Sequence, residues 1–195
     1  EQVVADRDKL YSGFSEVVVD EQLIDQFYAG EAIFLENPSR FYPHQFIMLI
    51  SSANPKKTAL CRFQGGRLPL KMIVGEKRNI SWGIMPRNKE QSFAFDLLFD
   101  NKIPLVSMIG RAGSGKTLIA IAAGLEQTLG LRDRIYKKIV VSRPVQPMGK
   151  DIGYLPGSMN EKMLPWLMPI QDNIQCILGN DRTMLKSYLD SGEIE

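Results

Sequence analysis

The sequence predicts an α/β protein in which a P-loop core with a parallel sheet follows a small β-rich domain. Three observations lead to this fold class. The apolar run Leu105–Ile109 passes directly into a glycine-rich loop and then into an apolar helix, Lys116–Leu129. A second continuous apolar run, within Lys138–Ser142, is typical of buried parallel strands. The residues before this core form short β segments separated by turn residues. We therefore expect two domains, 1–81 and 82–195.

Composition sets the broad class. The 195 residues are 44% hydrophobic and 24% charged, which is ordinary for a soluble globular protein. The net charge of +2 does not indicate a nucleic-acid binder, so any basic surface has to be local. No apolar run is long enough to span a membrane, and the charged N-terminus does not resemble a secretory signal. We expect a cytoplasmic protein without a membrane partner.

Cysteine and histidine offer little chemistry. Cys61 and Cys176 lie far apart and form no C-x-x-C pattern, so we expect two reduced thiols rather than a disulfide or a zinc site. His44 is the single histidine, which excludes a cluster of histidine metal ligands. We expect a structural or surface role for it.

The first domain should begin with a β segment within Gly13–Val19. Asp20 is a suitable N-cap for a helix over Glu21–Tyr28, which Gly30 would end. The remaining segments with strand-like patterns are Glu31–Leu35, Gln45–Ser51, Thr58–Phe63 and Leu68–Val74.

The second domain should combine its parallel sheet with several helices. We expect a helix over Asn88–Phe99, then the strand Leu105–Ile109. The helix Lys116–Leu129 is apolar almost all round, which predicts burial on more than one side, and Gly130 is a natural stop. With the strand Lys138–Ser142 it would complete a βαβ unit. A long loop over Arg143–Met163 and two helices, Pro165–Leu178 and one capped by Asp181, should follow.

The glycine-rich loop carries the chemistry. Residues Gly110–Thr117 fit the pattern G-x-x-x-x-G-K-(S/T) between a predicted strand and a predicted helix. Glycines allow the backbone to bring its N–H groups close to an anion, and the following helix adds its positive end. Lys116 would reach the β- and γ-phosphates, and Thr117 would place its hydroxyl on Mg²⁺. The candidate phosphate-binding residues are Gly110, Arg111, Ala112, Gly113, Ser114, Gly115, Lys116, Thr117 and Leu118. The alternative is a glycine-rich turn with an exposed lysine.

Three stretches together resemble one family. They are Trp82–Gln91, the loop Gly110–Thr117, and Ser142–Gly157 with its Arg-Pro…Gly-Tyr-Leu-Pro-Gly pattern. In this order and spacing they resemble the PhoH-like ATPases, and most of all the longer members with an N-terminal PIN ribonuclease domain. The resemblance implies a fold like that of superfamily 1 helicases, ATP and Mg²⁺ as ligands, ring-shaped homo-oligomers, and RNA or single-stranded DNA as the polymer. In the fused members it implies RNA unwinding coupled to cleavage.

The resemblance also implies roles for residues outside the loop. Gln91 would read the adenine edge of the nucleotide, because a glutamine amide can both donate and accept. An exposed helix glutamine is the alternative. Asn88 is a further candidate nucleotide-binding residue. Arg143, Lys150 and Tyr154 would contact nucleic acid through phosphates and base stacking. The alternative is a loop that packs on a neighbouring subunit or domain.

Two departures from the family pattern matter. The sequence contains no PIN domain, and it contains no apolar strand that ends in Asp-Glu, the pair that would hold Mg²⁺ and orient water. We therefore expect a piece of a longer protein that hydrolyses ATP poorly by itself. Two other classes stay open: a P-loop kinase or other phosphotransferase, and a nucleotide-sensing module without motor activity.

Overall fold

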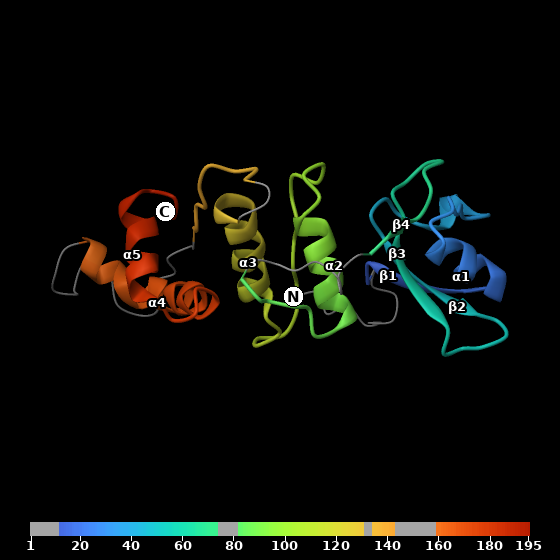
Figure 1. Ribbon diagram of the computed structural model, residues 1–195, viewed down its shortest axis with the longest axis horizontal. Helices are drawn as coiled ribbons and strands as arrows, with labels where there is room; N and C mark the ends of the chain where they lie inside the picture. The colour runs from blue at the N-terminus through green and yellow to red at the C-terminus, as the bar shows by residue number, and fades with distance from the viewer. Residues whose placement is uncertain (1–11, 74–81, 131–133, 143–158) are drawn as a thin grey trace, which may run out of the picture. The chain divides into compact units, whose positions relative to one another are not determined.

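The computed structural model describes residues 12–73, 82–130, 134–142 and 159–195, which fall into two compact units (Figure 1). The first unit is Glu1–Val74 and the second is Gly75–Glu195. All named strands lie in the first unit, and the second is helical over its described residues. The mixed α/β class is thereby confirmed.

The first unit is built on a four-stranded mixed sheet of order β1-β2-β3-β4. Its strands are β1 (Phe14–Val19), β2 (Phe46–Ser51), β3 (Thr58–Arg62) and β4 (Lys71–Met72). β1 runs parallel to β2 with Phe14 opposite Phe46, and the other pairs are antiparallel. Parallel neighbours need a crossover connection. Here it contains α1 (Glu21–Tyr28) and the short 3-10 helix η2 (Pro38–Arg40).

Helix α1 covers the face of the sheet that holds the core of the first unit. Its Ile24 and Phe27, three residues apart, are buried against Ile47 and Leu49 of β2. An ion pair fixes α1 to the turn between β2 and β3: Lys57 Nζ lies 2.7 Å from Asp25 Oδ1 and 3.0 Å from Glu21 Oε1. Hydrogen bonds to Asp25 and then Glu21 raise the pKa of Lys57.

A buried cation lies at the end of β3. Arg62 is 1% exposed, and its Nη1 lies 2.7 Å from Nδ1 of His44. A guanidinium only donates, so this histidine nitrogen accepts. His44 has a φ of +67° and donates its backbone N–H to the Phe63 carbonyl. The single histidine is therefore part of the packing of the first unit.

The two cysteines differ sharply in surroundings. Cys61 is fully buried in β3 and donates its Sγ–H to the Ile47 carbonyl, and burial raises its pKa from the ordinary 9.0 to about 12. Cys176 is exposed on a helix of the second unit. Since only the thiolate reacts, a thiol reagent at mildly alkaline pH should label Cys176 rapidly and Cys61 only after unfolding.

We expect one cysteine per chain to react rapidly with the reagent in the folded protein, and two in denaturant. Two rapidly labelled thiols in the folded chain would contradict the packing of β3.

The raised pKa of Cys61 also makes the stability of the fold depend on pH. Above pH 9.0 the unfolded chain loses the Cys61 proton before the folded chain does, so this group should lower stability as pH rises from 9.0 toward about 12.

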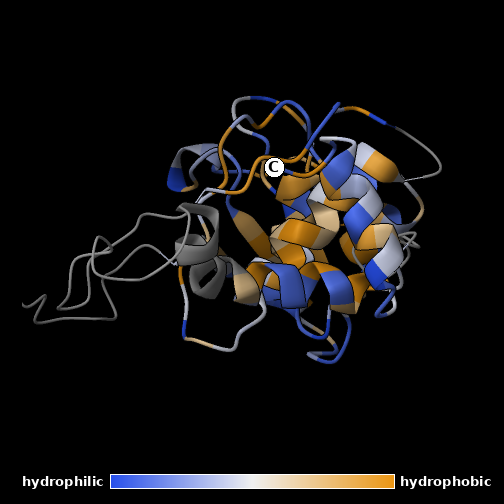
Figure 2. Ribbon diagram, turned by 90° about the vertical axis from the view of Figure 1, so that its left-hand side faces the viewer, coloured by the Kyte–Doolittle hydropathy of each residue, from blue (hydrophilic) through white to orange (hydrophobic). Residues whose placement is uncertain are grey.

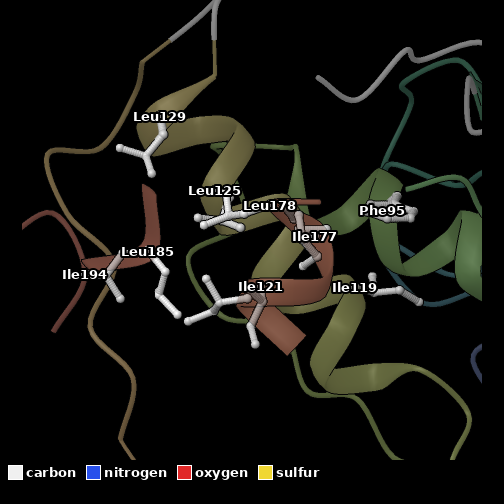
Figure 3. Packing of buried hydrophobic residues seen from close by; sticks show 12 residues of the cluster. Phe95, Ile119, Ile121, Leu125, Leu129, Ile177, Leu178, Leu185 and Ile194 are labelled. Carbon is white, nitrogen blue, oxygen red and sulfur yellow. The ribbon is translucent and has the colours of Figure 1, made fainter. Parts of the chain in front are cut away.

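The second unit is a cluster of helices: α2 (Lys89–Leu98), α3 (Lys116–Leu129), α4 (Met159–Ile177) and α5 (Arg182–Asp190). Figure 2 shows hydrophobic and hydrophilic residues on different sides of the helices. α3 lies at the centre of the packing and is buried on more than one side, as its sequence predicts. The core residues labelled in Figure 3 are Phe95, Ile119, Ile121, Leu125, Leu129, Ile177, Leu178, Leu185 and Ile194.

The predicted strands of the second domain are not formed in the described residues. Leu105–Ile109 is irregular, with Leu105 83% and Ile109 97% exposed. In place of a strand over Lys138–Ser142 there is a single parallel bridge, Ile139 with Ile194. Its hydrogen bonds run from Ile139 N to Glu193 O and from Val141 N to Glu195 O, both 2.8 Å. A parallel strand exists only with hydrogen-bonded neighbours. The described chain supplies none to 105–109, so the predicted βαβ unit and parallel sheet are wrong for this structure.

Three smaller predictions also need correction. Glu31–Leu35 is not a strand, although the Ile33 carbonyl accepts from Leu70 N at 2.8 Å. The predicted strand Leu68–Val74 is reduced to β4 within its described part. α4 begins at Met159 rather than Pro165, so the predicted loop is shorter at that end. By contrast, α1 and α3 have the predicted bounds.

Candidate nucleotide-binding site

The glycine-rich loop lies at the start of α3. The helix begins at Lys116, and its N-cap residue Gly115 has a φ of +85°; Gly113, two residues earlier, has a φ of +78°. Residues with a Cβ rarely adopt such values, which explains glycine at both positions. The chain can therefore turn tightly from the loop into the helix and direct backbone N–H groups toward one point.

Lys116 folds back over this loop. Its Nζ donates to the carbonyls of Gly110 (2.9 Å) and Arg111 (2.7 Å), and to Ser114 Oγ at 3.2 Å. The loop thus wraps around the ammonium group, which lies within the curve of the glycine-rich segment. A phosphate that entered the loop would meet a positive charge already in place.

The electrostatics of the helix start favour an anion. α3 has 14 residues and no acidic side chain in its first turn. The first N–H groups of a helix have no partner within it, and the helix dipole places positive charge there. Thr117 is exposed at this end, so its hydroxyl is accessible to a ligand. The arrangement can hold a phosphate chain by its geometry.

Gln91 connects α2 to the loop. Its Nε2 donates to the Ser114 carbonyl at 3.2 Å, and its Oε1 accepts from Arg87 N at 2.8 Å. Asn88 is the N-cap of α2, and its Oδ1 accepts from Gln91 N at 2.9 Å. The approach is close, because a Cβ on Gly115 would lie 3.2 Å from Gln91 Nε2. A side chain at 115 would therefore crowd Gln91, in addition to the strain that its backbone angle would impose.

The two helices behind the site are joined along their length. Gln127 of α3 is buried and donates from Nε2 to the Leu98 carbonyl at the end of α2, 3.1 Å away. Phe95 of α2 and Ile119 of α3 are both in the core of the second unit. This packing holds Gln91 against the loop.

The structure brings together the predicted loop residues with Asn88 and Gln91. It does not describe Arg143, Lys150 or Tyr154, which lie outside the described ranges. Among the described residues, no group of three or more histidine, cysteine, aspartate or glutamate side chains could hold a metal ion. Two contacts were not predicted: the backbone N–H of Arg87 and the side chain of Gln127. Gln127 could have been suspected, since it is one of the few polar residues in a largely apolar helix.

No helix in the described part of the chain has the length and apolar character needed to cross a membrane.

The loop, its lysine and the helix behind it define the class: a mixed α/β protein with a P-loop-type sequence at a helix N-terminus. The chain belongs to the PhoH-like protein family, whose sequence model matches residues 83–195. The family consists of P-loop NTPases that generally bind ATP. This confirms the resemblance seen in the sequence.

Curated relatives extend the similarity into the first unit. "Protein PhoH2" of Bacillus subtilis is 44% identical over 178 residues, which cover 90% of this chain and 40% of that protein. "Protein PhoH2" of Mycolicibacterium smegmatis is 34% identical over 186 residues, or 95% of this chain and 40% of the relative. A "PhoH-like protein" of B. subtilis is 37% identical over 91 residues, or 47% of this chain and 27% of the relative.

The chain thus spans about 40% of the length of the two PhoH2 proteins. No solved structure matches it.

Proposed function

We propose that the second unit binds ATP, with the phosphates held in the loop Gly110–Thr117. The observation that carries this proposal is the position of Lys116, enclosed by the loop at the positive end of α3. Membership of a family that generally binds ATP supports it. Saturable binding of ATP to the chain, competed by ADP, is the basic test.

The roles follow from chemistry. Backbone N–H groups of the loop and the start of α3 bind phosphate oxygens, and Lys116 exchanges its carbonyl partners for the β- and γ-phosphates. Mg²⁺, when bound, neutralises phosphate charge, and Thr117 would be its ligand from this chain. Asn88, the N-cap of α2, bonds Gln91 N, and Gln91 of α2 bonds the loop at Ser114. In this proposal the base binds beside these two residues.

For the whole protein we propose an ATP-driven motor of helicase type that acts on RNA or single-stranded DNA as a homo-oligomer. In that proposal a PIN domain elsewhere in the protein cleaves RNA. The sequence resemblance over residues 82–157 supports it. A kinase is the rival. ATP hydrolysis by the whole protein should rise with single-stranded nucleic acid if it is a motor, and with a small acceptor if it is a kinase.

Gln91 should influence which nucleotide binds. If its amide contacts adenine, Gln91→Ala should narrow the preference for ATP over GTP, because a site that hydrogen-bonds its ligand discriminates strongly. The measurement is the ratio of the two dissociation constants.

Gln91→Glu is the matched control. It keeps an acceptor for Arg87 N but removes the donor to the Ser114 carbonyl, so it should weaken the binding of both ATP and GTP through the loop. Any additional loss for ATP alone would report the contact with adenine. An unchanged ratio of dissociation constants in Gln91→Ala would return this residue to a purely structural role.

The segment after Ser142 should contact nucleic acid. Arg143→Ala or Lys150→Ala should lower the slope of log K against log salt by about 0.7 for single strands, as each removes one phosphate contact. Tyr154→Ala should weaken binding with little change in slope, because stacking is not ionic. If all three variants bind nucleic acid as the wild type does at every salt concentration, the segment instead packs on a neighbouring subunit or domain.

A further inference from the structure

The first unit contains a cavity of about 660 Å³ that lies along β1. Residues Ser15–Val19 of β1 line it, together with Ile33–Asn37 of the crossover connection. None of these residues belongs to the nucleotide-binding site of the second unit.

In the sheet formed by the described residues β1 is an edge strand, and its residues Ser15–Val19 line the cavity. The carbonyls of Gly13 and Val19 accept from β2 and the residue after it, Phe46 N and Ser52 N, both at 2.9 Å. In a parallel pair, alternate residues bond to the same neighbour. With Phe14 opposite Phe46, the N–H and C=O groups of Glu16 and Val18 therefore point away from β2. An edge of this kind is a template for another strand.

The connection Ile33–Asn37 forms another part of the cavity lining. The carbonyls of its two end residues are already hydrogen-bonded, since Ile33 O accepts from Leu70 N and Asn37 O accepts from Arg40 N. Within the described chain, no backbone hydrogen bond joins Phe34–Glu36 to β1. Within the described residues, this connection therefore does not pair with the outer edge of β1.

The side chains indicate the chemistry of the occupant. Val17, Leu23, Leu35 and Leu49 provide an apolar floor. The charged lining residues are Glu16, Asp20, Glu36 and Arg40, an excess of carboxylates. The Asp20 side chain makes no capping hydrogen bond to α1. An apolar floor with acidic borders suits a strand with apolar side chains on one face and basic side chains on the other.

We propose that this groove binds an extended peptide with alternating apolar and basic residues, which adds to the sheet as a strand beside β1. Main-chain hydrogen bonds to Glu16 and Val18 supply affinity, and the alternate side chains supply specificity. A peptide fits better than the sheet edge of a second copy, because the connection Ile33–Asn37 lines the same cavity as β1 and a single strand needs less room than a sheet.

The probe is a short synthetic peptide of alternating valine and lysine, with a valine–glutamate peptide as its charge control. The lysine peptide should bind the 195-residue chain saturably, and the glutamate peptide at least about tenfold more weakly, because its carboxylates meet the acidic border. Bound peptide should slow hydrogen exchange at the amides of Glu16 and Val18, while those of Ser15 and Val17, already bonded to β2, should change little.

Two variants test the geometry. Val18→Pro removes an outward N–H and is tolerated on an edge strand, so it should weaken binding about 3- to 10-fold relative to Val18→Ala. Glu36 lies outside the strand ladder, so Glu36→Lys changes the charge without disturbing strand pairing. It should weaken binding of the lysine peptide and strengthen binding of the glutamate peptide.

Absence of saturable binding would overturn the proposal, and so would binding by Val18→Pro and Glu36→Lys that equals that of the wild type. So would concentration-dependent dimerisation that Val18→Pro abolishes, since the occupant would then be a second copy.

Discussion

Leu125→Ala is expected to lower the free energy of unfolding of the second unit by about 2–5 kcal/mol. Leu125 is 0% exposed and lies in the core to which α2, α3, α4 and α5 all contribute (Figure 3). Truncation removes buried methyl groups and leaves a cavity that the surrounding helices fill only in part. Both tryptophans, Trp82 and Trp166, belong to this unit, so urea unfolding followed by tryptophan fluorescence reports on it.

Leu189→Ala on α5 is the matched control. Leu189 is 40% exposed, and its truncation should cost no more than about 0.5 kcal/mol. Equal losses in the two variants would contradict the central position of α3. Because the helix behind the loop would be loosened, Leu125→Ala should also weaken ATP binding.

Lys116→Ala should remove most of the stabilisation that ATP gives the chain. At a ligand concentration about 100 times Kd, ATP should stabilise the wild type by about 2.7 kcal/mol. For a chain of this length that corresponds to a rise in Tm of about 5–10 °C. The variant lacks the ammonium group that the loop encloses, so its Tm should hardly respond to ATP.

Lys102→Ala controls for the loss of a positive charge. Lys102 is an exposed residue of the same unit and lies outside the loop, so this variant should keep the full ATP-dependent shift. The stability of Lys116→Ala without nucleotide should stay near that of the wild type, since exposed hydrogen bonds of the lysine contribute little. An unchanged ATP response in Lys116→Ala would contradict the role of the loop.

Local sequence signals predicted the local structure well. Gly115 and Gly130 mark the two ends of α3, and its residues favour a buried helix, so its bounds followed directly. Asp20 and the spacing of Ile24 and Phe27 did the same for α1. In both cases the pattern that decides the element lies within the element itself.

Strand pairing in the second unit could not be predicted in this way. The apolar residues of Leu105–Ile109 favour burial. A strand, however, also needs hydrogen-bonded partner strands, and these are distant in sequence. Ile139 finds Ile194 as its partner, a pairing that no local pattern reveals. Pro165 suggested a helix start by its residue type, yet α4 begins at Met159.

The same distinction applies to the site. The glycine pattern places the loop at the start of α3 without reference to the rest of the chain. The contact between Gln91 and the Ser114 carbonyl joins residues far apart in sequence, and it depends on how α2 packs on α3. The sequence resemblance assigned Gln91 to the adenine, whereas the structure shows its amide engaged with Arg87 and the loop. A role in base recognition therefore remains a proposal.

The most direct test of the central claim is a titration of the chain with ATP and Mg²⁺ followed by the amide resonances of the loop. If the phosphates bind between the loop and α3, the largest shifts should fall on Gly113, Gly115, Lys116 and Thr117, with smaller ones at Gln91. The same titration of Lys116→Ala should show these shifts only at much higher ATP. Saturable shifts centred on other residues, or none at the loop, would contradict the account.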